Sequence, residues 1–146
     1  FFKAHGANIS IIQGYGMTET CGPVCAQVLD ATVPGSIGIP FPSNEIKIVD
    51  PDTKEILPYG ETGEICIYSP ATMAGYLDNE KETNEILQMD KKGKIWVHTG
   101  DLGYMTEDGT LRLYYYHEFY QWPFIVTLQA KEQDYGYWVL SNLPVA

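Results

Sequence analysis

Apolar and polar side chains alternate with a period of two along much of the middle of this chain, a pattern that predicts β-strands. The alternation is clear at Glu45–Val49 and again at residues 64–68. Turn signals at residues 50–52 and 58–63 separate these segments, and residues 55–57 are predicted to form a return strand. Each strand has one apolar face, so from about residue 41 we expect a curled antiparallel sheet or small barrel over one core.

Two further apolar runs lead into glycine-containing segments. Residues 8–12 predict a buried strand that ends in a turn at residues 13–20, and residues 96–98 predict another that ends in a turn at residues 99–103. A hairpin is expected at residues 107–109, where an Asp-Gly step is a turn signal. Residues 1–4 are predicted to be the tail of a helix.

Residues 78–89 are the best candidate for a helix. Asn79 is expected to cap it, and Glu82 completes the pattern of a capping box. Ile86 and Leu87 supply its only strong apolar face, so we expect the helix on the surface. The lysine-containing turn that follows is most simply solvated, with phosphate binding as the alternative.

The chain is acidic, with 146 residues, a net charge of −10 and an isoelectric point near 4.5. This balance argues against nucleic acid or an anionic membrane surface as a partner. The sequence has no apolar run of about 18 residues and no basic-then-apolar leader, so we expect no transmembrane segment, no signal peptide and a cytoplasmic location. The length suits one domain with a workable core.

Cysteine and histidine spacing does not indicate a metal site. The three cysteines have no C-x-x-C pair, which predicts reduced thiols rather than disulfides or structural zinc. Cys25 or Cys66 is expected to face a core. His98 could line a ligand site, but a strand histidine satisfied by the backbone is the simpler interpretation. The residues of these two types are Cys21, Cys25, Cys66, His5, His98 and His117.

The most informative segment is Gln13-Gly14-Tyr15-Gly16-Met17-Thr18-Glu19-Thr20. Its two glycines permit unusual backbone dihedral angles and a close approach of a ligand to the main chain. Tyr15 offers a flat face for stacking, Thr18 offers a donor to a phosphate oxygen, and Glu19 offers a hard oxygen ligand for Mg²⁺. These residue types suit a nucleotide and its metal, although such a segment is equally compatible with a plain tight corner.

Three other segments favour a nucleotide site over a plain tight corner. Asp101, in His98-Thr99-Gly100-Asp101, is expected at the end of a strand, where a carboxylate could accept two hydrogen bonds from a ribose diol. Between the two segments lie Gly60-Glu61-Thr62-Gly63-Glu64-Ile65-Cys66-Ile67 and Gly75-Tyr76-Leu77. In this order and spacing, residues 1–113 closely resemble the adenylate-forming superfamily, which includes acyl- and aryl-CoA ligases, luciferases and the adenylation domains of peptide synthetases.

The resemblance implies an α/β fold with a β-rich part, as a fragment of the large N-terminal domain of such an enzyme. Residues 1–40 would be the C-terminal edge of the α/β subdomain that binds nucleotide and acyl group. Residues 41–113 would be a β-barrel-like subdomain, and residues 114–146 a tail without a family match.

The resemblance also implies chemistry. Members activate a carboxylic acid with Mg·ATP as an acyl-adenylate, and many transfer the acyl group to coenzyme A. Tyr15 would pack against adenine, with Gly14 beside it, Thr18 would contact the α-phosphate, Glu19 would ligate Mg²⁺, and Asp101 would bind the ribose hydroxyls. Gly16 and Met17 complete the nucleotide-binding segment. The methionine is common in acyl- and aryl-CoA ligases, which favours a CoA ligase.

Other family parts are expected outside this chain. The phosphate loop would lie upstream of Phe1, and the lid domain with its late lysine would lie downstream, so we expect the fragment to be inactive alone. Arg112 lies where a strand residue is usual, so it is not assigned the role of the family's ribose-contacting arginine. The aromatic-rich segment from Tyr114 reads as a frame-shifted tail or, alternatively, a natural C-terminus.

Other functions fit the same residues. A non-catalytic nucleotide-binding or structural remnant is the main alternative to an acid–CoA ligase fragment. An adenylation domain of a peptide synthetase and a luciferase-type oxidase differ from a ligase only in context that these motifs do not carry. The acid substrate is not predicted by the sequence.

Overall fold

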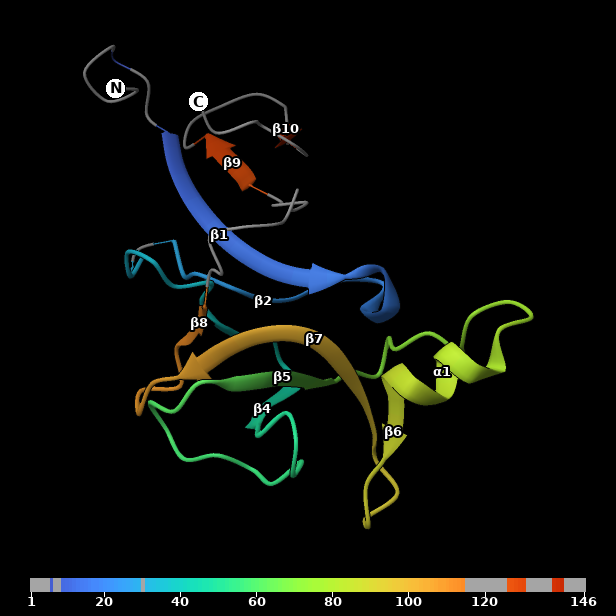
Figure 1. The fold of residues 1–146 in the computed structure, drawn as a ribbon. Helices are drawn as coiled ribbons and strands as arrows, with labels where there is room; N and C mark the ends of the chain where they lie inside the picture. Colours follow the sequence, from blue (N-terminus) through green and yellow to red (C-terminus); the bar gives the residue numbers. More distant parts are fainter. Residues whose placement is uncertain (1–5, 7–8, 30, 115–125, 131–137, 141–146) are drawn as a thin grey trace.

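The computed structural model describes residues 6, 9–29, 31–114, 126–130 and 138–140 (Figure 1). Within them the chain forms two antiparallel sheets and one short α-helix, α1, at Glu80–Ile86. No helix among these residues has the length and apolar character needed to cross a membrane.

The first sheet has the strand order β10-β9-β1-β2-β3. β1 pairs with β2 along one edge and with β9 along the other, and a single 3-10 turn, η2, joins β1 to β2. The bounds are β1 Ile9–Met17, η2 Thr18–Thr20, β2 Gly22–Ala26, β3 Ile39–Pro40, β9 Val126–Ala130 and β10 Trp138–Leu140.

The second sheet has the order β4-β5-β7-β6, and β8 pairs with the far end of β7. The long strand β7 therefore contacts three others and forms the centre of this sheet. The bounds are β4 Glu45–Val49, β5 Gly63–Tyr68, β6 Leu87–Met89, β7 Ile95–Met105 and β8 Leu111–Leu113.

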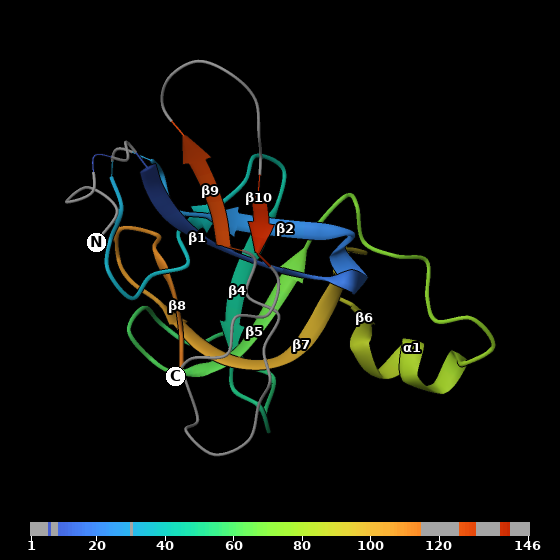
Figure 2. The same cartoon turned by 90° about the horizontal axis from the view of Figure 1, so that it is seen from above.

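The main hydrophobic core lies between the two sheets. In Figures 1 and 2, β1 and β2 cross over β5 and β7. The first sheet contributes Tyr15, Val24 and Cys25 to this core, while Ile65 and Val97 come from the second. Burial of these side chains, at roughly 25 cal/mol per Å² of apolar surface, is the main force holding the sheets together.

Several predicted elements are confirmed. The strands at Glu45–Val49 and 64–68 and the hairpin at residues 107–109 are present, and Cys25 and Cys66 are both buried. The predicted return strand at residues 55–57 is reduced to one bridge between Val49 and Ile56. The predictions for residues 1–4, for His5 and His117, and for most of the tail lie outside the described residues.

The predicted turn at residues 13–20 is wrong for its first part, because β1 continues to Met17. The glycines there serve strand packing and do not adopt a positive φ. A Cβ at Gly16 would lie 2.2 Å from the carbonyl oxygen of Gly22, and one at Gly14 would lie 3.1 Å from that of Cys25. The small residues let β2 approach β1 closely beside an irregular register between Tyr15 and Gly16.

The predicted helix at residues 78–89 is too long. α1 ends at Ile86 because Leu87 adopts an extended conformation, and β6 then pairs with β7. The cap is confirmed, since the Asn79 side chain accepts a hydrogen bond from the Glu82 amide. The reciprocal half of the capping box is replaced, because the Asn79 amide donates to the carbonyl of Tyr76. No residue of α1 is buried, as expected for a surface helix.

We expect Gly16→Ala to lower the free energy of unfolding more than Gly14→Ala does. The Cβ at position 16 would meet backbone atoms that move only if β1 and β2 separate, a kind of overpacking that costs about 1–3 kcal/mol. Urea unfolding of the two variants and the parent chain measures the difference. Equal stability of the two variants would show that the β1–β2 approach is not tight.

Candidate functional site

Two of the predicted site residues meet between the sheets. The Tyr15 hydroxyl, from β1, donates a hydrogen bond of 2.6 Å to Oδ2 of Asp101, from β7. Tyr15 is 8% exposed and belongs to the core, while Asp101 is half-buried. A carboxylate has about four acceptor positions, so Asp101 retains acceptor capacity for a ligand beside the tyrosine.

Burial raises the pKa of both partners above their ordinary values. For Tyr15 the Asp101 charge adds to the effect, because a phenolate beside a carboxylate is repelled. For Asp101 the hydrogen bond from Tyr15 partly opposes the burial effect, since the donor favours the ionised carboxylate. Tyr15 is therefore a firmly neutral donor to Asp101.

Asp101 lies within a bulge of β7, not at the end of a strand as predicted. Glu64 pairs with Leu102 and Cys66 pairs with His98, so Thr99, Gly100 and Asp101 together oppose the single residue Ile65. Extra residues of this kind bend a strand and turn its side chains in new directions, and bulges are common beside active sites. This bulge turns the Asp101 carboxylate toward Tyr15.

Side chains on both strands fix the backbone of the bulge. Oε1 of Glu64 accepts a hydrogen bond of 3.2 Å from the Gly100 amide. The Thr99 hydroxyl accepts one of 3.0 Å from the Asp101 amide and donates one of 2.8 Å to the carbonyl of Ile65. Two consecutive amides that lose their regular ladder partners thus find side-chain acceptors.

Glu64 itself is buried, and its second oxygen lies between Lys54 and His98. Its Oε2 lies 3.0 Å from Nζ of Lys54 and 3.0 Å from Nδ1 of His98. Burial alone would raise the pKa of Glu64, but these hydrogen bonds and that from Gly100 outweigh burial and leave the pKa below its ordinary value. The prediction that the backbone satisfies His98 is wrong, because the side-chain partners of its ring are Glu64 and Cys66.

Glu64, Cys66 and His98 place three potential metal-ligand atoms within 4.8 Å of one another. The Cys66 sulfur lies 3.4 Å from Nδ1 and 3.9 Å from Nε2 of His98, so it is beside the ring rather than along the lone pair of either nitrogen. A sulfur that shared a metal with Nδ1 would lie much further from Nε2 than from Nδ1. The arrangement therefore favours a hydrogen-bonded cluster over a metal centre.

Glu19, the predicted Mg²⁺ ligand, is held by the segment before α1. The Tyr76 hydroxyl donates a 2.5 Å hydrogen bond to Oε1 of Glu19, and the Met73 amide donates to the Glu19 carbonyl. The bond to Glu19 is the main cause that raises the pKa of Tyr76 to about 12. Glu19 lies in the 3-10 turn η2, between the exposed Thr18 and the buried Thr20.

The turn carrying Glu19 is stabilised internally. The Thr20 hydroxyl accepts a hydrogen bond from the Met17 amide and lies within hydrogen-bond distance of the carbonyls of Met17 and Gly22. After it, Cys21 adopts a positive φ of 55° and lets the chain reverse into β2. Thr18 and Glu19 thus sit on a rigid reversal at the end of β1.

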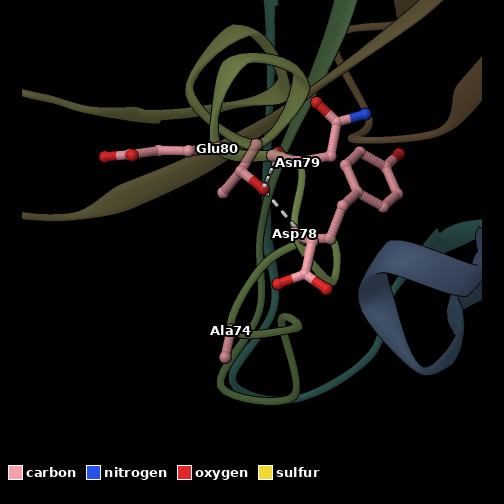
Figure 3. Close-up of a pocket in the computed structure, with 6 residues that line it drawn as sticks. Ala74, Asp78, Asn79 and Glu80 are labelled. Atoms are coloured by element: carbon pink, nitrogen blue, oxygen red, sulfur yellow. Dashed lines mark hydrogen bonds between the residues drawn. The ribbon is translucent and has the colours of Figure 1, made fainter.

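An open hollow of about 440 Å³ lies at the segment before α1 and at the start of that helix. Figure 3 shows Asp78, Asn79 and Glu80 around it, and Tyr76, the partner of Glu19, also lines it. The structure therefore brings together two groups of site residues, Tyr15 with Asp101 and Glu19 with Tyr76. The sequence offered Gly75-Tyr76-Leu77 only as a motif, and the Gly63-Glu64 pair gave no sign of the contact to Gly100.

A family model described as AMP-binding enzyme matches residues 1–77. That is more than half of the chain. This chain belongs to the AMP-binding enzyme family. The chain is 48% identical over 100 residues to a probable 4-coumarate–CoA ligase 2 from Dictyostelium discoideum, covering 68% of this chain and 17% of that protein. It is 44% identical over 104 residues to a long-chain-fatty-acid–CoA ligase from Salmonella typhimurium, covering 70% of this chain and 18% of that protein.

Solved structures of the family agree with this fold. A long-chain-fatty-acid–CoA ligase from Archaeoglobus fulgidus has a TM-score of 0.64 at 36% identity, covering 70% of this chain and 21% of its own. O-succinylbenzoate coenzyme A synthetase from Bacillus subtilis, in complex with AMP, has a TM-score of 0.61 at 35% identity, with coverages of 70% and 20%. The chain thus has the predicted mixed α/β, β-rich fold and matches part of the N-terminal domain of adenylate-forming enzymes. It spans less than a fifth of the length of these two curated relatives.

Tyr15→Phe should destabilise the chain by about 1–3 kcal/mol, because the half-buried Asp101 loses a hydrogen-bond donor. The lost hydrogen bond stabilises mainly the ionised form of Asp101. Without the donor the raised pKa of Asp101 rises further, so the loss should be largest at neutral pH and shrink as falling pH protonates Asp101. Urea unfolding of both proteins across pH gives this difference. Tyr59→Phe, at an exposed loop position, is the control, and a loss that does not vary with pH would contradict the charged contact.

Proposed function

We propose that this chain is part of an ATP- and Mg²⁺-dependent acid–CoA ligase that activates a carboxylic acid as an acyl-adenylate and transfers it to coenzyme A. The hydrogen bond between Tyr15 and Asp101 carries the proposal, because it joins the expected adenine contact to the expected ribose contact. The CoA ligases among the relatives support the reaction class.

A nucleotide would approach where β1 and the bulge of β7 meet. Adenine would pack beside Tyr15 and the neighbouring Gly14, Gly16 and Met17, while the ribose hydroxyls would donate to Asp101. Thr18 would contact the α-phosphate from the exposed start of the 3-10 turn. Two anions, the acid and the phosphate, must come together in this reaction, so donors and metal that neutralise developing charge give most of the stabilisation.

The Glu19 carboxylate fits the role of Mg²⁺ ligand. Mg²⁺ is usually held by one or two carboxylates together with phosphate oxygens and water. The Tyr76 hydroxyl and the Met73 amide hold Glu19 in one orientation while its side chain stays half-buried and reachable. The metal would supply positive charge against the phosphates, and Glu19 would hold it beside Thr18.

The remaining parts belong to the same proposal. Residues 1–40 would form the edge of the α/β subdomain, residues 41–113 the β-barrel-like subdomain, and residues 114–146 a tail without a catalytic role. The phosphate loop and the lid would come from the rest of the parent enzyme. The free thiols Cys21, Cys25 and Cys66 suit a reducing, cytoplasmic location.

We expect the 146-residue chain alone to give no acid-dependent ATP–pyrophosphate exchange. Transition-state stabilisation would need donors from the phosphate loop and lid. The assay would use 4-coumarate and a long-chain fatty acid, with heat-treated chain as the background. Exchange above that background would show that these residues suffice for adenylation.

Glu19→Gln should remove the dependence of ATP binding on Mg²⁺. The parent chain should bind ATP more tightly with Mg²⁺ than with a chelator. Loss of the Glu19 carboxylate should reduce this increase in ATP affinity by about tenfold or more, because even changes to residues that only support a metal ligand have effects of that size. Calorimetric titration of both proteins measures it. Glu55→Gln, an exposed glutamate in a loop, serves as the matched control. An unchanged Mg²⁺ effect would place the metal elsewhere.

A further inference from the structure

We propose that Glu64 is a positioning residue that sets the direction of the Asp101 carboxylate by holding the amide of Gly100. The inference rests on the proposed function, in which Asp101 binds ribose. It adds a residue on a neighbouring strand that touches no ligand and acts only through the backbone of the bulge.

The bulge gives Glu64 this leverage. Gly100 lies at its exposed tip with a φ of 72°, a conformation that glycine adopts at little cost. The same freedom makes the tip easy to displace unless its amide is held. Oε1 of Glu64 is the acceptor of that amide, and Gly100 is bonded directly to Asp101. A shift of the Gly100 amide therefore rotates the Asp101 backbone and moves its carboxylate away from Tyr15.

Glu64 is well suited to the task because its own orientation is fixed. Its side chain is nearly buried, and its second oxygen is gripped by Lys54, from the loop after β4, and by His98, from β7. The Cys66 thiol also faces this cluster, and Lys47 of β4 lies opposite Cys66. Burial raises the pKa of the Cys66 thiol to about 12, so the thiol stays neutral and does not compete with Glu64 for Lys54.

Two conservative substitutions separate positioning from charge. Glu64→Gln keeps an oxygen at the reach of the Gly100 amide but loses the charge that pairs with Lys54. Glu64→Asp keeps the charge but withdraws the oxygens by one methylene. If Glu64 positions the bulge, the aspartate variant is impaired and the glutamine variant is not. If only the ion pair matters, the order is reversed. The same two changes at Glu61, an exposed neighbour in the preceding turn, are the controls.

The first measurement needs no ligand. Amide hydrogen exchange of the ¹⁵N-labelled chain at neutral pH should show the Gly100 amide protected in the parent chain and in Glu64→Gln. In Glu64→Asp it should exchange about tenfold faster, as loss of one hydrogen bond allows. The Asp101 amide, held by Thr99, should stay protected in all three. Equal Gly100 protection in Glu64→Asp and the parent chain would overturn the proposal.

The second measurement is the preference for AMP over 2′,3′-dideoxy-AMP, determined by calorimetry. Hydrogen bonds from ribose to Asp101 should give the parent chain a preference of about 10- to 100-fold. In Glu64→Gln this preference should stay within about threefold of the parent value. In Glu64→Asp the preference should fall about tenfold, while the affinity for dideoxy-AMP stays unchanged. Lys54→Met, which removes the ion pair but leaves His98 beside Oε2 of Glu64, should retain the preference.

Asp101→Asn distinguishes failure of the proposed ribose contact from failure of the positioning role of Glu64. If the parent chain shows no ribose preference, or Asp101→Asn leaves it unchanged, the proposed ribose contact fails and the role of Glu64 fails with it. If Asp101→Asn abolishes the preference while Glu64→Asp keeps it, the nucleotide site stands and the positioning role is overturned. Loss of the preference in both, with Glu64→Gln retaining it, supports the proposal.

Discussion

The hydrogen bond from Tyr15 to Asp101 is the contact on which the candidate site depends. It is a polar link between strands of different sheets, at the rim of the apolar core that packs them together. Apolar packing sets the distance between the sheets but is not directional. A short hydrogen bond between a buried phenol and a half-buried carboxylate is directional and aligns the two strands at this point, as the backbone hydrogen bonds of Leu111 with Ile37 and Gly38 do beside β3 and β8. In the proposed function, the base and the ribose of a nucleoside would bind on either side of this hydrogen bond.

Much of the fold was accessible from local sequence signals. Alternating residues at Glu45–Val49, the Asp-Gly step of the β7–β8 hairpin and the Asn79 cap each depend on neighbours a few residues away. The family motifs also located Tyr15 and Asp101, which the structure brings together. Local pattern and motif order thus indicated the second sheet in outline and the main pair of the site, whereas the antiparallel pairing of β1 with β2 and of β2 with β3 was not predicted.

What the sequence could not predict depends on register between distant segments. The helix prediction failed at Leu87 because pairing with β7 outweighs the helical preference of residues 87–89. The bulge at Thr99–Asp101 arises from the offset between β5 and β7, which no single segment encodes. The contact of Glu64 with Gly100 and that of Tyr76 with Glu19 join residues more than thirty positions apart. Such contacts follow only once the strands are paired.

The three carboxylates of this region, Glu64, Asp101 and Glu19, have different neighbours. Glu64 forms an ion pair with Lys54, which balances its charge, and also contacts His98. Asp101 and Glu19 instead accept hydrogen bonds from the phenols of Tyr15 and Tyr76, which orient these carboxylates, and neither forms an ion pair among the residues that the structure describes. An uncompensated carboxylate favours a hydroxyl donor or a divalent cation over a phosphate. The neighbour of each carboxylate therefore indicates its role. Glu64, which is paired with a lysine, suits holding the backbone, whereas Asp101 and Glu19, which accept hydrogen bonds from phenols, would suit ribose and metal.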